Sequence, residues 1–195
     1  MAEPIDPKTA LRTYLHETRE ALIWKLDGLG ERDLRMPRTP TGTNLLGLLK
    51  HSLNVEAGYF GETFGREFPD AAELVPFTKY QEDPQADWYA RDDESAPGIR
   101  DLYRRVAAFA DQTIDELPLD APGRVPWWGP SGRPVTLHQI IIHVITDLSR
   151  HAGQADILRE SIDGAAGMLP DSSNLPDYDW SAYVATLTTL ANRHP

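Results

Sequence analysis

The stretch HVITDLSRHAGQADILRE, residues 143–160, carries three side chains that can ligate a metal ion. They are His143, Asp147 and His151, spaced four residues apart. Positions i and i+4 lie one turn apart on the same face of a helix, so these groups could point at one ion. Imidazole and carboxylate ligands suit Zn, Ni, Fe or Mn. The spacing therefore indicates a divalent metal site, which would need a further ligand from another segment.

His51 is the candidate for that further ligand, because it lies midway along a second predicted helix beside a strongly apolar face. An inward-facing histidine there could meet the last long helix across a bundle, where metal sites are built from facing helices. Two other interpretations remain open on spacing alone. His143 could hydrogen-bond a metal ligand or a carbonyl group, and Asp147 with His151 could be an ordinary ion pair on the helix.

The elements that must position these residues follow from the hydrophobic periodicity. Apolar residues at spacings of three and four predict four long helices and a short one, near residues 7–27, 44–64, 97–117, 137–162 and 180–192. Asp6, Thr43, Ser95 and Thr136 are the expected N-caps. We predict an all-α fold, a four-helix bundle with long crossover loops and a short C-terminal helix.

The connections between these helices differ in character. Residues 66–94 are rich in Pro and Asp and predict a long surface loop, while residues 118–134 predict a turn-rich segment or a small hairpin. We expect a single domain over residues 1–195, with its core at about 7–162 and an extension at 163–195.

The composition argues against several classes of functional site and binding partner. The chain has 195 residues, no cysteine and a formal net charge of −11. The missing cysteines exclude disulfides, thiolate ligands and a cysteine nucleophile. The acidity disfavours nucleic acid and anionic membrane as partners. No apolar run approaches the ~20 residues of a membrane span, and MAEPIDPKTA shows no secretory pattern, so we expect a cytoplasmic protein.

The pattern H-x3-D-x2-R-H-x-G-Q-A-D-I-L-R-E, with a single histidine in the second helix, resembles the DinB-like superfamily. The similarity covers roughly residues 10–165 and is greatest to an uncharacterised actinobacterial branch and to mycothiol-dependent maleylpyruvate isomerase-like proteins. It implies a metal triad of His51, Asp147 and His151. At the position of Asp147 many members have His, and the isomerase-like branch has Glu, which is one methylene longer. His143 is therefore the alternative ligand or a group supporting one.

The resemblance also implies a function. We expect a metal-dependent thiol S-transferase or isomerase that acts on a small molecule, often as a homodimer, with an external low-molecular-weight thiol such as mycothiol. The alternative is a non-catalytic stress-related or ligand-binding protein with a structural metal. Binding to DNA is disfavoured by the negative charge.

Several further side chains are candidates for roles near the ion. Glu56, about one turn beyond His51, is a possible general base, or else a surface residue. Trp127-Trp128 would form a lid on the end of the bundle or one wall of a substrate site. A substrate carboxylate would need a cation, for which the candidates are Arg12, Arg19 and Arg124.

Overall fold

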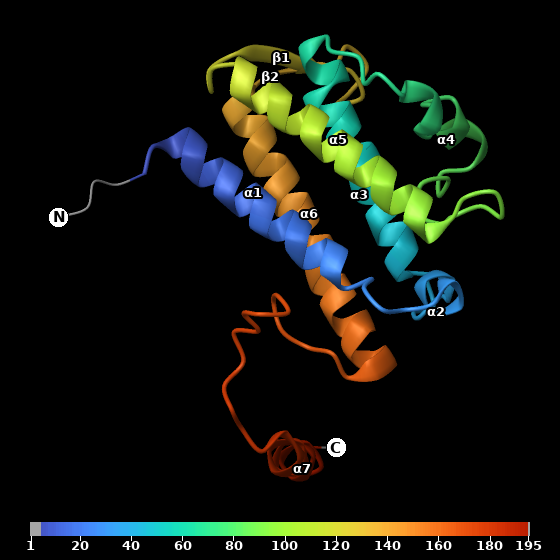
Figure 1. Ribbon diagram of the computed structural model, residues 1–195, viewed down its shortest axis with the longest axis vertical. Coiled ribbons are helices and arrows are strands. Elements are labelled where there is room, and N and C mark those ends of the chain that lie inside the picture. Colours follow the sequence, from blue (N-terminus) through green and yellow to red (C-terminus); the bar gives the residue numbers. More distant parts are fainter. Residues whose placement is uncertain (1–4, 195) are drawn as a thin grey trace.

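Four long helices form the body of the computed structural model, which describes residues 5–194 (Figure 1). They are α1 (Pro7–Trp24), α3 (Leu45–Phe60), α5 (Ala96–Glu116) and α6 (Leu137–Asp163). Asp6, Asn44, Ser95 and Thr136 each cap one of them, because their side-chain oxygens accept backbone N–H groups of the first turn. The predicted four-helix architecture is confirmed.

The second long helix differs most from its prediction. It begins after Asn44 rather than Thr43, and it ends at Phe60 rather than at residue 64. At Gly61 the chain leaves the helix and enters a short 3-10 turn, η1 (Glu62–Phe64). A Cβ at Gly61 would lie 2.4 Å from the Ala57 carbonyl oxygen, so only glycine permits this exit.

Helix α3 is the centre of the bundle. It packs against both α5 and α6, and α6 also packs against α1. Leu46, Leu49 and Leu53 of α3 are almost completely buried, as expected for a helix that is covered on most sides. The buried polar groups of α3, such as Lys50 and Glu56, therefore meet neighbouring elements, and the partly exposed His51 reaches α6.

The connections contain short elements that cover one side and one end of the bundle. Helix α2 (Glu31–Arg35) follows α1, and η2 (Ala71–Glu73) and α4 (Lys79–Glu82) interrupt the long segment between α3 and α5. For residues 118–134 the sequence allowed either a turn-rich segment or a small hairpin, and the hairpin is present. Its strands are β1 (Pro122–Val125) and β2 (Arg133–Thr136), paired antiparallel with Gly123 opposite Val135.

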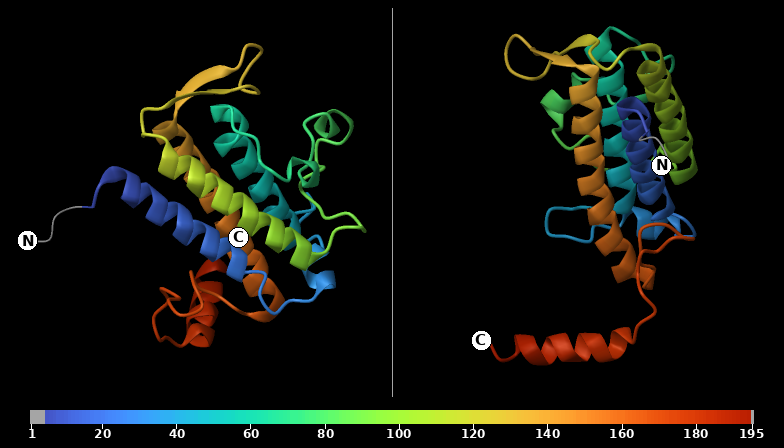
Figure 2. Two further views of the ribbon diagram at one scale, coloured as in Figure 1. Left: turned by 45° about the horizontal axis from the view of Figure 1, so that its top comes forward. Right: turned by 90° about the vertical axis from the view of Figure 1, so that its left-hand side faces the viewer.

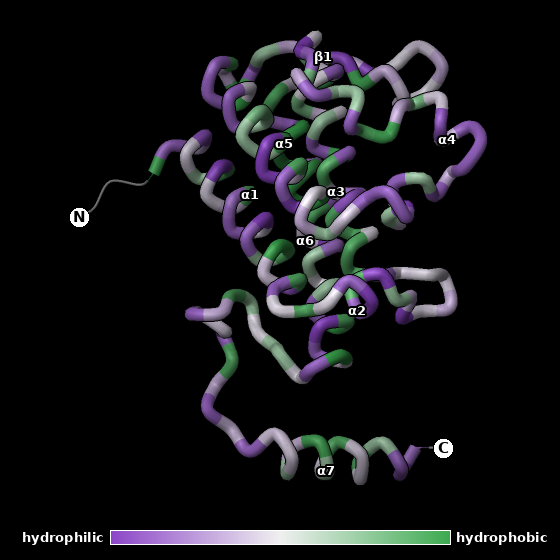
Figure 3. Tube along the Cα trace, turned by 45° about the vertical axis from the view of Figure 1, so that its right-hand side comes forward, coloured by the Kyte–Doolittle hydropathy of each residue, from purple (hydrophilic) through white to green (hydrophobic). Residues whose placement is uncertain are grey.

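Helix α7 (Trp180–Ala191) stands away from the bundle (Figure 2). None of its residues is buried, although its hydropathy is largely apolar (Figure 3). The extension touches the bundle before α7 begins, where the Trp24 indole N–H donates to the Met168 carbonyl at 2.5 Å. No helix within residues 5–194 is long and apolar enough to cross a membrane. The homodimer stays a prediction.

Candidate metal centre

Three of the predicted ligands converge between α3 and α6. His51, Asp147 and His151 each offer one ligand atom, and the three atoms lie within 4.8 Å of one another. Asp147 Oδ2 is 3.5 Å from His151 Nε2 and 3.9 Å from His51 Nε2. The i, i+4 pair on α6 and the single histidine of α3 are thus brought together as the sequence predicts.

His51 is held with one ring nitrogen free. Its Nδ1 lies 2.8 Å from Asp87 Oδ2, and its ring stacks on Trp88 with centroids 3.9 Å apart and planes inclined by 17°. A carboxylate beside Nδ1 stabilises the tautomer that carries the proton there. The lone pair of Nε2 then faces Asp147, as metal ligation requires.

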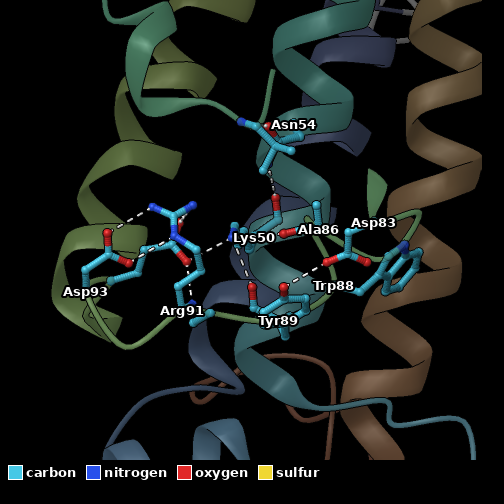
Figure 4. A network of polar contacts seen from close by, with 12 residues as sticks. Lys50, Asn54, Asp83, Ala86, Trp88, Tyr89, Arg91 and Asp93 are labelled. Atoms are coloured by element: carbon cyan, nitrogen blue, oxygen red, sulfur yellow. Dashed lines mark hydrogen bonds and ion pairs between the residues drawn. The ribbon is translucent and has the colours of Figure 1, made fainter. Parts of the chain in front are cut away.

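The loop that supplies Asp87 and Trp88 is anchored on α3. The Lys50 ammonium donates to the carbonyls of Ala86 and Tyr89, at 3.0 Å each (Figure 4). One turn before His51, Gly47 leaves room for this loop, since a Cβ there would lie 1.9 Å from the Trp88 carbonyl oxygen. The position of Asp87 relative to His51 is therefore set by buried polar contacts of α3.

His151 is oriented in the same way by its own helix. Its Nδ1 lies 2.8 Å from Gln154 Oε1, and an amide oxygen can only accept, so Nδ1–H donates to it. The side chain is buried, with 7% of it exposed. Its Nε2 therefore faces Asp147, and in the neutral ring this nitrogen carries the lone pair that a metal ion would need.

Asp147 completes the cluster with an oxygen that has no hydrogen-bond partner. Oδ2 is buried and unpaired among the described residues. Burial alone would raise the pKa of this carboxyl, but interaction with His151 and then with His51 lowers it below its ordinary value. Burial would lower the pKa of His151, yet Asp147 and Gln154 together raise it. Asp147 is therefore ionised at neutral pH.

The donor set and spacing fit a divalent ion. Atoms ~2.1 Å from one ion in a tetrahedral arrangement are roughly 3.4 Å apart. The 3.5 Å pair matches this separation. The 3.9 Å pair, and the two imidazole nitrogens, which lie within 4.8 Å of each other, would have to move closer by side-chain rotation. A buried carboxylate oxygen that has no hydrogen-bond partner and faces two imidazoles is stabilised by positive charge, which a bound cation or a protonated ring supplies. These residues could hold such an ion.

His143 is not part of this cluster. Its Nε2 lies 3.0 Å from the Tyr59 hydroxyl, which also accepts hydrogen bonds from the indole N–H groups of Trp127 and Trp128 at 3.4 and 3.0 Å. The structure therefore brings the α3 histidine to Asp147 and His151, and it places the alternative ligand against the hairpin.

A cavity of about 720 Å³ opens beside the cluster. His51, Asp147, His143 and Trp127 line it, whereas His151 does not. Its other walls are mainly apolar. The aromatic hairpin loop is thus one wall of the cavity as well as a cover over the end of the bundle.

Glu56 does not have the role considered from the sequence. Its carboxylate is fully buried and pairs with Arg19 through bonds of 2.5 to 3.1 Å, and it accepts a bond from the Tyr103 hydroxyl at 2.9 Å. A helical turn of 100° per residue carries Glu56 to another side of α3 than His51, so it faces α1 and α5. It is neither a surface residue nor part of the cavity wall.

The three arginines considered for substrate binding are also engaged elsewhere. Arg19 belongs to the buried pair, Arg12 pairs with Asp115, and Arg124 donates to the Ser131 carbonyl within the hairpin. Arg66 lines the cavity, but its guanidinium pairs with Glu116 at 2.6 Å.

The comparisons with known proteins assign the chain to a family and agree with its fold. Residues 10–164 match the model of the mycothiol S-transferase family, a DinB-like family. The chain belongs to the mycothiol S-transferases. No curated protein matches it. A conserved protein from Enterococcus faecalis, solved by crystallography, shares the fold of this family member with a TM-score of 0.55 and 17% identity, over 83% of this chain and 100% of that one.

Sequence reasoning missed the roles of four residues at this candidate site. Gln154 lies three positions after His151, so helical spacing could have identified it as the partner of that ring. Asp87 and Trp88 lie in a loop without periodicity, and Tyr59 reads as one more apolar residue of α3. Their roles depend on tertiary contacts that no local pattern encodes.

Proposed function

We propose that this protein is a metal-dependent S-transferase that joins a small external thiol to an electrophilic small molecule in the cavity. The observation that carries the proposal is the buried, unpaired Asp147 Oδ2 between two preset imidazoles at the wall of a large cavity. Membership of the mycothiol S-transferase family supports mycothiol, or a similar low-molecular-weight thiol, as the sulfur donor.

The ligands would be His51, Asp147 and His151, and the ion Zn, Ni, Fe or Mn. Two imidazoles and one carboxylate leave coordination positions open, which is typical of catalytic sites. When bound, the ion would lower the pKa of a thiol, so that the sulfur is a thiolate at neutral pH. A thiol from outside is needed because the chain has no cysteine.

The protein's own groups account for the remaining steps. Asp87 and Gln154 keep the two rings in place through their Nδ1 atoms. The apolar walls exclude water and hold the electrophile near the sulfur. In the transfer, the S–H proton passes to solvent and an S–C bond forms. Either the leaving group departs from that carbon with the bonding electron pair, or, with a conjugated carbonyl acceptor, the neighbouring carbon takes up a proton.

The open cavity favours this proposal over a purely structural metal. A structural site would have its fourth position closed by a protein group, and the candidate for that position, His143, is engaged by Tyr59. A substrate carboxylate is also disfavoured, because the cation that lines the cavity is already paired.

The test is a thiol-dependence screen on metal-loaded protein. A fluorogenic bimane electrophile would be offered with mycothiol, glutathione, cysteine or no thiol, and conjugation measured against the uncatalysed rate. Acceleration that needs both the metal and a thiol supports the proposal. Tight metal binding without acceleration under any thiol would favour the structural alternative.

A further inference from the structure

The Tyr59 hydroxyl lies at the centre of a hydrogen-bond cluster beside the metal centre. It receives indole N–H groups from Trp127 and Trp128, and it lies 3.0 Å from His143 Nε2. Tyr59 is on α3, His143 is on α6, and the two tryptophans belong to the loop between β1 and β2. The cluster therefore ties the hairpin to both helices that carry the metal ligands.

The direction of each hydrogen bond in this cluster follows from the chemistry of its members. An indole N–H can only donate, so the two tryptophans occupy the acceptor positions of the hydroxyl. The phenol proton needs an acceptor, and among the groups bonded to Tyr59 only His143 Nε2 can accept it. Tyr59 is buried, which makes an unmade bond costly. Tyr59 thus donates to Nε2, and neutral His143 carries its proton on Nδ1.

That Nδ1–H is available to a ligand. Within residues 5–194, Nε2 is the ring nitrogen of His143 that forms a hydrogen bond, and Nδ1 is not among the buried unpaired atoms. The side chain lines the cavity one helical turn from Asp147. Edge-to-face contacts with Trp128 and Tyr59, with centroids 4.9 and 4.7 Å away, hold the ring in place.

The surrounding charges indicate which acceptor this donor would meet. Glu62, Glu67, Asp87 and Asp147 line the same cavity. The guanidinium of Arg66, also in its wall, is neutralised by Glu116. An anionic group would be repelled from such a wall, whereas a neutral carbonyl oxygen needs only a neutral N–H.

We propose that His143, fixed by Tyr59 as its Nδ1–H tautomer, is the hydrogen-bond donor that binds the carbonyl oxygen of a neutral electrophile, such as a maleimide or an enone. This proposal assumes that the electrophile binds in the cavity, and so it rests on the proposed function. A neutral imidazole that donates to a carbonyl stabilises the negative charge developing on that oxygen when sulfur attacks the conjugated carbon.

The first experiment needs neither turnover nor metal. Nitrogen-15 NMR of the histidine rings at pH about 8.5, where imidazoles are ordinarily neutral, should show His143 protonated on Nδ1 and bare on Nε2. Tyr59→Phe should shift that ring toward the opposite tautomer. An Nε2–H tautomer in the wild-type protein would overturn the proposal, whatever the protein catalyses.

The second experiment tests the ligand class with unreactive probes. N-ethylsuccinimide, which is neutral and carries two carbonyl oxygens, should move the His143 resonances, while succinate should leave them in place. If succinate moved the His143 resonances and N-ethylsuccinimide did not, the assignment of a neutral acceptor would be overturned. A response to neither probe would overturn the subsite itself.

A matched pair of variants separates the two ring nitrogens. His143→Asn places an amide N–H near the position of Nδ1, and His143→Gln places its amide near Nε2. In the conjugation assay with N-ethylmaleimide, His143→Gln should lower kcat/KM for the electrophile about 5- to 10-fold and leave the KM of the thiol unchanged. His143→Asn should recover most of that loss, and equal losses in both variants would contradict the proposal.

Discussion

The carboxylate of Asp87 gives the sharpest quantitative prediction for the candidate metal centre. It is almost completely buried and lies 2.8 Å from His51 Nδ1, so Asp87→Ala removes a charge-assisted hydrogen bond and leaves the ring free to turn. Loss of a group that orients a metal-ligating histidine costs roughly 10–100-fold in metal affinity. This corresponds to about 1.4–2.7 kcal/mol, close to the ~1.5–3 kcal/mol of a hydrogen bond to a charged group.

The assay is competitive titration of the apoprotein with zinc against a chromophoric chelator, at one fixed pH. Gln154→Ala should have a smaller effect than Asp87→Ala, because Gln154 is a neutral acceptor for His151 and charge-assisted bonds are roughly twice as strong. Asp83→Ala is the matched control. It removes a carboxylate from the same loop, one that accepts from the Tyr89 hydroxyl and does not touch His51.

The outcomes are distinct. Zinc affinity should fall in Asp87→Ala and stay within about threefold of wild type in Asp83→Ala. If Asp87→Ala kept the wild-type affinity with unchanged helical circular dichroism, the buried carboxylate would have no influence on His51. If both variants lost affinity equally, disorder of the loop would explain the loss, and the reasoning from the Asp87 hydrogen bond would be refuted.

Three other perturbations have defined outcomes. Glu56→Ala leaves Arg19 as an unpaired buried charge and should lower the free energy of unfolding by about 3–5 kcal/mol in urea titrations. If the folded variant no longer bound zinc, Glu56 would have a role at the metal after all. The raised pKa of His151 in the folded apoprotein stabilises it fully below the unfolded pKa of about 6.5. Apoprotein stability should therefore decline as the pH rises through the folded pKa, and the trend should reverse with zinc, which binds neutral imidazole; melts at several pH values without that reversal would count against the site. Deletion of residues 180–195 should change the free energy of unfolding by less than ~0.5 kcal/mol, since α7 buries no residue, and a large shift in the urea midpoint would show that α7 is packed in solution.

The long helices and the pairing of Asp147 with His151 were predictable because they depend on local rules, whereas His51 was added from its position on a core-facing helix and from the resemblance to DinB-like proteins. Caps such as Asp6 and Thr136 lie beside regular apolar spacing, and that spacing recurs wherever a helix faces a core. Asp147 and His151 share a helix face by geometry alone. For these features, the sequence and the structure express the same periodicity.

The features that were not predictable depend on contacts between distant segments. Glu56 looks like a charged residue one turn beyond His51, and only the packing of α1 and α5 around α3 shows that it meets Arg19. Asp87 reaches His51 across 36 positions of the chain through an irregular loop. The end of α3 at Phe60 also depends on tertiary structure, because the close approach at Gly61 competes with helical continuation.

The account rests on a metal ion held by His51, Asp147 and His151, and elemental analysis tests it most directly. Protein purified without a histidine tag and dialysed against a trace of zinc should hold about one ion per chain. His151→Ala should release most of it, whereas His143→Ala should retain it, because His143 bonds Tyr59 and lies outside the cluster. Retention of the ion by His151→Ala and its loss from His143→Ala would contradict the assignment.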